Sequence, residues 1–143
     1  MIRIINEPLD ASVELRAFLG TAGEGAVASF VGIVRGTDGV EALTLDHYAG
    51  FTEKQIAALV DGLIDRHQLS SAIVVHRFGF MKPGETILFA ATSAPHRRAA
   101  LDALDELVEQ LKSEAPFWKK ERRFGTENWL EPPELGQLLS QRN

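Results

Sequence analysis

The apolar positions of this chain repeat with two different periods, which predict where its strands and helices lie. Apolar, β-branched runs predict five strands, at residues 1–5, 25–35, 42–48, 72–78 and 86–92. Apolar residues at helical spacing predict helices at about 52–67 and 93–115, and a start signal at residues 8–10 with Gly20 as a stop predicts a third helix at about 8–20.

Turn signals predict how these elements connect. Asp38-Gly39 lies between two predicted strands, so we expect residues 25–35 and 42–48 to form a hairpin. Residues 81–85, Met-Lys-Pro-Gly-Glu, predict a tight turn after which 86–92 returns along 72–78. Thr52 and Gln55 have the spacing of a capping box at the start of the second helix.

The third helix is predicted to bury one arc and to end at a proline. Its arc contains Leu101, Leu104, Val108, Leu111 and Ala115, and Arg97 falls inside it while Arg98 points away. Pro116 lacks an amide hydrogen, so the helix is expected to end near Ala115, with Lys112 on its last turn. Phe117 and Trp118 then anchor the following segment.

The end of the chain carries weaker patterns. Trp129-Leu130-Glu131 predicts a short edge strand, Pro132-Pro133 breaks it, and residues 135–139 favour a final helical turn or two. The 143 residues are expected to form a single domain, 1–143. Without a signal pattern or a membrane-spanning apolar run, the expected location is the cytoplasm, with no membrane partner.

The composition narrows the chemistry. The chain has no cysteine, which excludes disulfides, zinc-thiolate sites, iron–sulfur clusters and thiol nucleophiles, and we expect neither a metal nor a cofactor. The net charge of −5 argues against nucleic acid as a partner. Five of the 15 basic residues nevertheless fall in one window: Lys112, Lys119, Lys120, Arg122 and Arg123. A basic site in an acidic protein favours a small anionic ligand.

A second set of cations lies at the start of the third helix. His96, Arg97 and Arg98 would repel the helix dipole unless an anion is bound there. The alternative is that these side chains pair with carboxylates of a neighbouring element. Arg35, at the end of a predicted strand, is a further candidate, although such an arginine is more often part of a surface ion pair.

The remaining polar candidates fit structural roles better. His47 and His76 lie in strand patterns without partners at metal-ligand spacing, so each is interpreted as a structural histidine. His67 is explained as a cation at a helix C-terminus, and Tyr48 and Trp129 as packing residues.

Five motifs in order resemble the large, catalytic subunit of the molybdopterin synthase family. They are Ser-Phe-Val-Gly-Ile-Val-Arg at 29–35, Leu-Thr-Leu-Asp-His-Tyr at 43–48, Val-His-Arg-Phe-Gly at 75–79, His96-Arg97, and Lys112 with Ala-Pro-Phe-Trp-Lys-Lys-Glu at 115–121. The resemblance runs from about residue 24 to 131.

The resemblance implies an α+β fold of the hammerhead type, with an antiparallel or mixed sheet and about three main helices, and a homodimer. It further implies that each protomer binds a small ubiquitin-like sulfur carrier with a C-terminal Gly-Gly, giving a heterotetramer. The implied reaction is transfer of sulfur from the carrier's thiocarboxylate to cyclic pyranopterin monophosphate, which forms the dithiolene of molybdopterin.

The resemblance also implies roles for individual residues. Lys112 and Lys119 match the catalytic lysines, and the positions that line the substrate pocket are Ile33, Val34, Arg35, His96, Arg97, Lys120 and Glu121. At Ile33, where relatives often carry a basic residue, only the backbone is expected to contact substrate. Where the family usually reads Ser-Ala-His-Arg, this chain has Pro95 before His96, which is expected to change the approach to the helix without moving His96. Whether His96 and Arg97 act in their own or the neighbouring protomer's site stays open.

A rival interpretation is a non-catalytic phosphate- or nucleotide-binding module on a ferredoxin-like scaffold. Such a module needs neither the lysine pair nor a carrier. Co-purification distinguishes the two, because a carrier ending in Gly-Gly supports the enzyme and a nucleotide alone supports the module.

Overall fold

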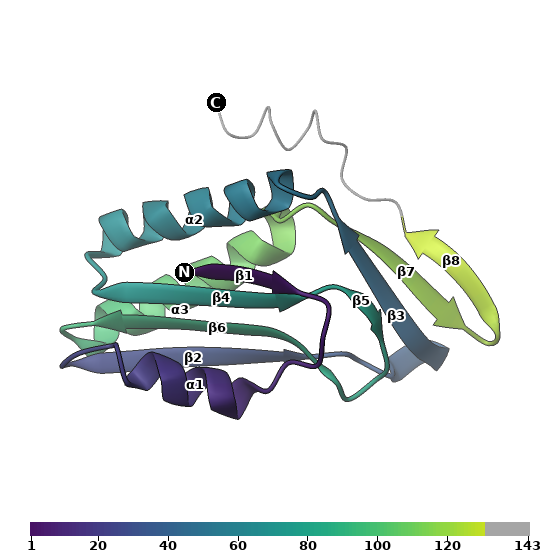
Figure 1. Cartoon of the computed structure of the whole chain (residues 1–143), viewed down its shortest axis with the longest axis horizontal. Coiled ribbons are helices and arrows are strands. Elements are labelled where there is room, and N and C mark those ends of the chain that lie inside the picture. The colour runs from purple at the N-terminus through teal and green to yellow at the C-terminus, as the bar shows by residue number, and fades with distance from the viewer. Residues whose placement is uncertain (131–143) are drawn as a thin grey trace.

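The computed structural model describes residues 1–130, which form three helices and two four-stranded sheets (Figure 1). The helices are α1 (Ala11–Leu19), α2 (Phe51–His67) and α3 (Arg97–Glu114). The first sheet contains β1 (Ile2–Ile5), β4 (Ser71–Arg77), β6 (Thr86–Ala94) and β2 (Ala26–Ile33), in that order. The second contains β5 (Gly79–Met81), β3 (Val40–His47), β7 (Phe117–Arg123) and β8 (Thr126–Leu130). The predicted α+β class with three main helices is confirmed.

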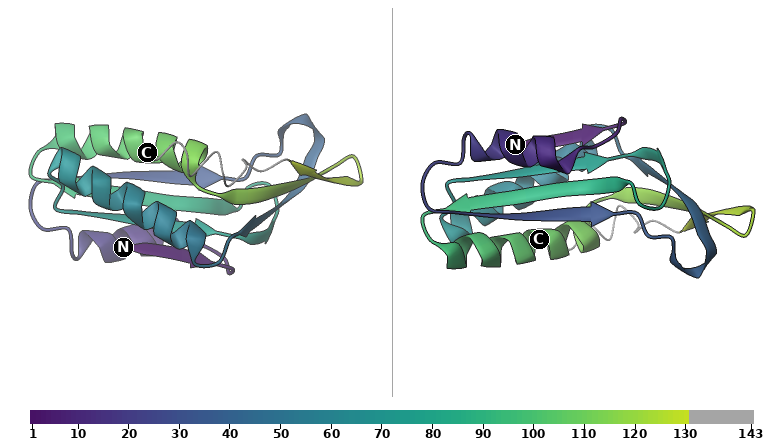
Figure 2. Two further views of the ribbon diagram at one scale, coloured as in Figure 1. Left: turned by 90° about the horizontal axis from the view of Figure 1, so that it is seen from above. Right: turned by 90° about the horizontal axis from the view of Figure 1, so that it is seen from below.

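The first sheet is the centre of the molecule because it is covered on both faces. Figure 2 shows α2 and α3 on one face and α1 on the other. Along β4 and β6 successive side chains alternate between these layers: Val74 and Ala90 face α2 and α3, whereas Val75 and Phe89 face α1. All four are fully buried. This sheet is mixed, since β1 runs parallel to β4 and the other pairs are antiparallel.

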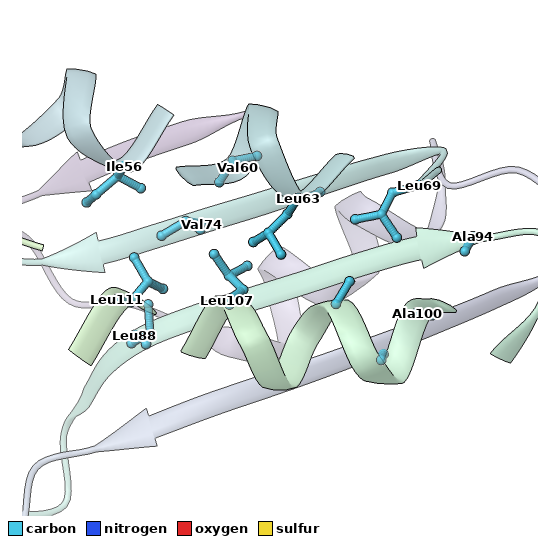
Figure 3. Close-up of a cluster of buried hydrophobic side chains, with 14 residues drawn as sticks. Ile56, Val60, Leu63, Leu69, Val74, Leu88, Ala94, Ala100, Leu107 and Leu111 are labelled. Atoms are coloured by element: carbon cyan, nitrogen blue, oxygen red, sulfur yellow. The ribbon is translucent and has the colours of Figure 1, made fainter. Parts of the chain in front are cut away.

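The main core lies between the first sheet and the pair α2 and α3. Leucine, isoleucine and valine side chains of α2 and the C-terminal half of α3 meet there (Figure 3). The start of α3 instead packs through Ala100 and Ala103, whose small side chains allow the helix to approach the sheet closely. This packing fixes both ends of α3 relative to the sheet.

The second sheet extends from one end of the first (Figure 1). All of its pairs are antiparallel: β3 pairs with β5 on one side and β7 on the other, and β8 pairs with β7. Buried Val34, Leu43, Leu45 and Met81 form a small separate core where the two sheets meet. The junction between the sheets therefore has its own apolar support.

The predicted hairpin of residues 25–35 and 42–48 is wrong. β2 pairs with β6, and β3 lies in the other sheet. After β2 the backbone of Val34 exchanges two hydrogen bonds with the 84–85 turn, each 2.9 Å, and the chain then crosses through the 3₁₀ turn η1 (Thr37–Gly39). The other predicted return is confirmed, because β4 and β6 are antiparallel neighbours.

Details at the helix ends also differ from the predictions. α2 begins at Phe51, and Glu53 rather than Gln55 accepts a hydrogen bond from a backbone amide, that of Gly50, at 2.6 Å. Thr52 instead accepts from the Tyr48 amide and donates to the Pro116 carbonyl, both at 3.0 Å. The capping-box prediction is therefore wrong, and Thr52 connects α2 to the segment before β7.

The buried arc of α3 is rotated from the predicted one. The buried side chains are Ala100, Ala103, Leu107 and Leu111, whereas Leu101 is 53% exposed. The prediction favoured large apolar residues, but small alanines occupy the close contact with the sheet. As predicted, α3 ends just before Ala115 and Pro116, and Lys112 lies on its last turn.

The segment after Pro116 is a strand that the pattern did not predict. β7 has long charged side chains on both faces, so no apolar alternation marks it. The predicted edge strand at Trp129 and Leu130 is confirmed as β8, while residues 131–139, with their predicted break and helical turns, lie outside the described residues.

Candidate active site

A pocket of about 410 Å³ lies where the two sheets meet. Three elements supply its functional side chains: the end of β2, the last turn of α3, and one face of β7. The residues lining it are Ile33, Val34, Arg35, Thr37, Asp38, Val40, Leu43, Ile87, Lys112, Lys119, Glu121 and Arg123. Residues more than 80 positions apart in the sequence thus share one cavity.

The alternation of β7 decides which of its residues reach the pocket. Lys119, Glu121 and Arg123 lie on one face of the strand and line the cavity. The opposite face carries Lys120, whose ammonium is 2.7 Å from the Glu127 carboxylate, and Arg122, which is 3.4 Å from Glu41. Lys120, predicted to line the pocket, is therefore not among its lining residues.

The pocket combines an apolar floor with a charged rim. Val34 and Leu43 are each 6% exposed and belong to the small core at the sheet junction. Above them the lining includes four basic side chains, Arg35, Lys112, Lys119 and Arg123, against the two carboxylates of Asp38 and Glu121. This excess of positive charge, in a chain of net charge −5, favours a small anion with an apolar or aromatic body.

The cations of the rim differ in how far they are already paired. Among the described residues, neither Arg35 nor Lys112 has an ion-pair or hydrogen-bond partner, and both side chains are exposed. The Lys119 ammonium lies 3.6 Å from the Glu121 carboxylate, longer than a charge-assisted hydrogen bond. Arg35, Lys112 and Lys119 can therefore direct their charge toward a ligand.

Glu121 is the one buried carboxylate of the described chain, with 8% of its surface exposed. A hydrogen bond of 2.8 Å from the Arg123 guanidinium is the main cause that holds the pKa of Glu121 below its usual range, against the opposing effect of burial. Charge attraction from Arg123 and Lys119 adds to this. Glu121 is therefore an anion that orders the cations around it.

His96 and Arg97 lie at the other end of α3 from the pocket. His96 is the N-cap residue, Arg97 begins the helix, and both are exposed. Arg97 was predicted inside the apolar arc and is not. Arg97 lies 15 positions before Lys112, which is about 22 Å along a helix. His96 and Arg97 therefore do not line this pocket.

His47 and His76 form an aromatic cluster beside β7. The His76 ring stacks on Phe117 with centroids 4.0 Å apart, and His47 lies 4.5 Å from the Phe78 ring. Burial lowers the pKa of His76 to about 4, so its ring is neutral at physiological pH. These contacts agree with the structural role predicted for both histidines.

Six of the nine predicted site residues therefore share the pocket: Ile33, Val34, Arg35, Lys112, Lys119 and Glu121. The sequence interpretation counted Arg123 in the basic window but did not assign it to the site, and it assigned neither Thr37 nor Asp38. A strand period of two running from Lys119 through Glu121 would have reached Arg123. Asp38 was interpreted only as a turn residue, and its positive φ of 57° confirms the turn.

The comparisons with known proteins agree with this geometry. The model of the family described as MoaE protein matches residues 4–114. The molybdopterin synthase catalytic subunit of Caulobacter vibrioides is 40% identical over 99% of this chain and 96% of its own length. The chain belongs to the MoaE family. Among solved structures, the MoaE protein of Burkholderia ambifaria has a TM-score of 0.81 at 34% identity, covering 99% of this chain and 96% of its own.

MoaE membership confirms the family, the enzyme class and the fold predicted from the motifs. The catalytic subunit of Escherichia coli is also 40% identical, over 83% of this chain and 81% of its own. The structure of molybdopterin synthase from Staphylococcus aureus matches with a TM-score of 0.80 at 32% identity, over 90% of this chain and 96% of that one. No helix among residues 1–130 is long and apolar enough to cross a bilayer.

Proposed function

We propose that this chain is the catalytic subunit of a molybdopterin synthase and that the pocket between its two sheets is the active site. The reaction is sulfur transfer from the C-terminal thiocarboxylate of a small carrier to cyclic pyranopterin monophosphate. The observation that supports this most directly is the cluster of Arg35, Lys112 and Lys119 around one cavity of a MoaE-family chain.

The pocket's two kinds of surface suit the two parts of this substrate. The floor formed by Val34, Leu43 and Ile87 accommodates the flat pterin, while the guanidinium of Arg35 pairs with phosphate oxygens. Ile33 and Val34 shape the cavity wall beside Arg35. Glu121 contacts the cations rather than the anionic group of the substrate.

Lys112 and Lys119 are proposed as the catalytic residues. As the thiocarboxylate sulfur bonds to a carbon of the substrate, the C–O bond at that carbon breaks, the oxygen leaves with a proton, and the carrier's acyl group becomes bonded through sulfur to the substrate. Hydrolysis of that thioester then leaves sulfur on the pterin and a carboxylate on the carrier, and a second carrier supplies the second sulfur. Ammonium groups at the pocket stabilise the negative charge that develops in both steps and donate the proton that the leaving oxygen takes up.

The sulfur must come from another molecule. The chain has no cysteine, so it cannot carry a persulfide. A carrier with an extended Gly-Gly tail is the partner we propose, because two residues without side chains can enter a narrow cavity. The cytoplasm is the proposed location of the complex.

The proposed assembly contains a homodimer. His96 and Arg97 lie about 22 Å along α3 from Lys112. They are exposed at the N-terminus of α3, whose first turn has no acidic residue to balance their charge. They can serve a substrate in the pocket only from a second protomer. With one carrier bound to each protomer, the assembly is a heterotetramer.

The test replaces each lysine in turn. Lys112→Ala and Lys119→Ala are expected to lower molybdopterin formation by at least a hundredfold, the scale of one lost electrostatic or acid–base group. Thiocarboxylated carrier and precursor are supplied, and the dithiolene product is measured. Carrier binding and thermal stability should stay near wild type because both side chains are exposed.

Lys54→Ala is the matched control, since Lys54 is an exposed lysine on α2 outside the pocket. It should retain full activity. Full activity in either pocket variant would disprove the catalytic assignment, and a wild-type chain that makes no product with any carrier would disprove the proposed function itself.

A further inference from the structure

Arg123 is the pocket residue whose contacts connect the most parts of the site. Its Nε donates to Glu121 Oε2 at 2.8 Å, and its Nη1 donates to the backbone carbonyl of Asp38 at 3.1 Å. One side chain thus joins β7 to η1, which is 85 positions away in the sequence. Both acceptors belong to residues that line the pocket.

The neighbouring contacts show that η1 and the start of β3 are held against the end of β7 and the β7–β8 turn. The Glu41 carboxylate accepts a hydrogen bond from the Gly125 amide at 2.9 Å and pairs with Arg122 at 3.4 Å. A Cβ at Gly39 would lie 2.4 Å from the Phe124 ring, so glycine permits this close contact. The part of the pocket formed by η1 is therefore held in place, and Arg123 is the residue that contacts η1 from within the pocket lining.

The contact with Glu121 has a consequence for Lys119. The Glu121 carboxylate has two oxygens; Arg123 holds Oε2 at 2.8 Å, and Lys119 lies 3.6 Å from Oε1. The closer, better hydrogen-bonded cation is therefore Arg123. Without it, the same buried carboxylate would have Lys119 as its nearest cation, and the two would form a full ion pair.

We infer that Arg123 is a positioning residue of this site: it holds Glu121 and the Asp38 turn in place, and so leaves the Lys119 ammonium available to the substrate. Its action on the reaction is through Glu121 and Lys119. The consequence for catalysis rests on the function proposed above, but the effect on Lys119 does not, because it concerns the unliganded chain.

The first test measures Lys119 directly. Acetic anhydride modifies neutral amines, and mass spectrometry of fragments gives the rate at each lysine. In Arg123→Gln, Lys119 should react about two- to fivefold more slowly, as expected for gaining a partly exposed ion pair that keeps the amine protonated. Lys54 serves as the internal reference and should not change.

Three further variants separate the cause from general disturbance. Arg123→Lys should recover part of the Lys119 rate, because a cation again faces Glu121. In the double variant Arg123→Gln with Glu121→Gln the slowing should disappear, since no carboxylate remains to capture Lys119. Arg122→Gln, the matched control on the opposite face of β7, should leave the rate unchanged. An unchanged rate in Arg123→Gln, or an equal change in Arg122→Gln, would overturn the inference.

The second test measures the steady-state kinetics of molybdopterin formation. Arg123→Gln should lower kcat more than it raises KM, Arg123→Lys should recover part of kcat, and Arg122→Gln should change neither constant. Thermal unfolding checks that each variant folds, and Arg123→Lys provides a variant of the same size if Arg123→Gln is unstable. If Lys119 is labelled more slowly in Arg123→Gln but the wild-type chain forms no molybdopterin, the inference about Arg123 holds and the proposed function is disproved.

Discussion

At the scale of single residues, His76 shows how burial sets the charge of a side chain next to the site. Its ring stacks on Phe117 and faces His47, whose Nε2 is 3.2 Å from the Glu53 carboxylate. Burial is the main cause that lowers the pKa of His76 to about 4, and repulsion from His47 adds to it. A neutral ring at this position allows Phe117, the first residue of β7, to pack tightly.

The lowered pKa makes stability depend on pH in a defined direction. The unfolded chain binds a proton at His76 near pH 6.5, whereas the folded chain does so only near pH 4. The free energy of unfolding is therefore unaffected by His76 above pH 6.5. As pH falls from 6.5 toward 4, the preference of the unfolded chain for the proton lowers the free energy of unfolding, by at most about 1.4 kcal/mol per pH unit.

His76→Phe keeps the aromatic contact with Phe117 and removes the titrating group. Urea unfolding at pH 7 and pH 5 should show a smaller loss of stability in this variant than in wild type. The exposed His96, changed to alanine, should retain the wild-type pH dependence. Identical pH dependence in His76→Phe and wild type would show that the His76 ring titrates normally.

At the scale of elements, one hydroxyl connects the start of α2 to the start of β7. Thr52 is fully buried and bonds both the Tyr48 amide and the Pro116 carbonyl. Thr52→Val keeps the shape of the side chain but leaves two backbone groups without partners. The expected cost is about 1–3 kcal/mol in the free energy of unfolding, measured by denaturant titration.

Thr126→Val, at an exposed position of β8, provides the comparison and should change stability by less than about 0.5 kcal/mol. A Thr52→Val protein as stable as wild type would mean that water replaces the hydroxyl. Reduced molybdopterin formation in a variant of intact fold would further indicate that this contact helps to position Lys119 on β7.

The elements that the sequence predicted correctly are those marked by local chemistry. Start and stop residues located α1, apolar patterns located α2, β4 and β6, and Pro116 located the end of α3 and hence Lys112. The pairing of β2 was not predictable in this way, because a turn signal such as Asp38-Gly39 does not specify whether the flanking strands pair with each other. Partners distant in the sequence, here β2 with β6, leave no local signal.

The site was predicted in part for the same reason. The motifs identified Arg35, Lys112, Lys119 and Glu121, which the structure places around one pocket. Arg123 was counted in the basic window but not assigned to the site, because β7 carries charge on both faces and the alternation that marks a half-buried strand is absent. A strand that forms the wall of a charged pocket lacks the apolar pattern by which strands are found.

At the scale of the whole molecule, α3 places two groups of cations at opposite ends. Lys112 lies beside the pocket, and His96 with Arg97 lies about 22 Å away along the helix. Within one protomer these groups cannot bind the same small molecule. A two-fold symmetric dimer can bring the start of one α3 to the pocket of the other protomer, and then does so twice.

Mixed dimers test this arrangement. Lys112→Ala chains and Arg97→Ala chains are each expected to be nearly inactive alone. After unfolding and refolding together, half of the dimers are mixed, and in these one site carries both changes while the other has Lys112 and the partner's Arg97 intact. Activity should return to roughly one quarter of wild type. If size measurements confirm mixed dimers and no activity returns, Arg97 does not serve the neighbouring pocket, and the cations at the start of α3 have another role.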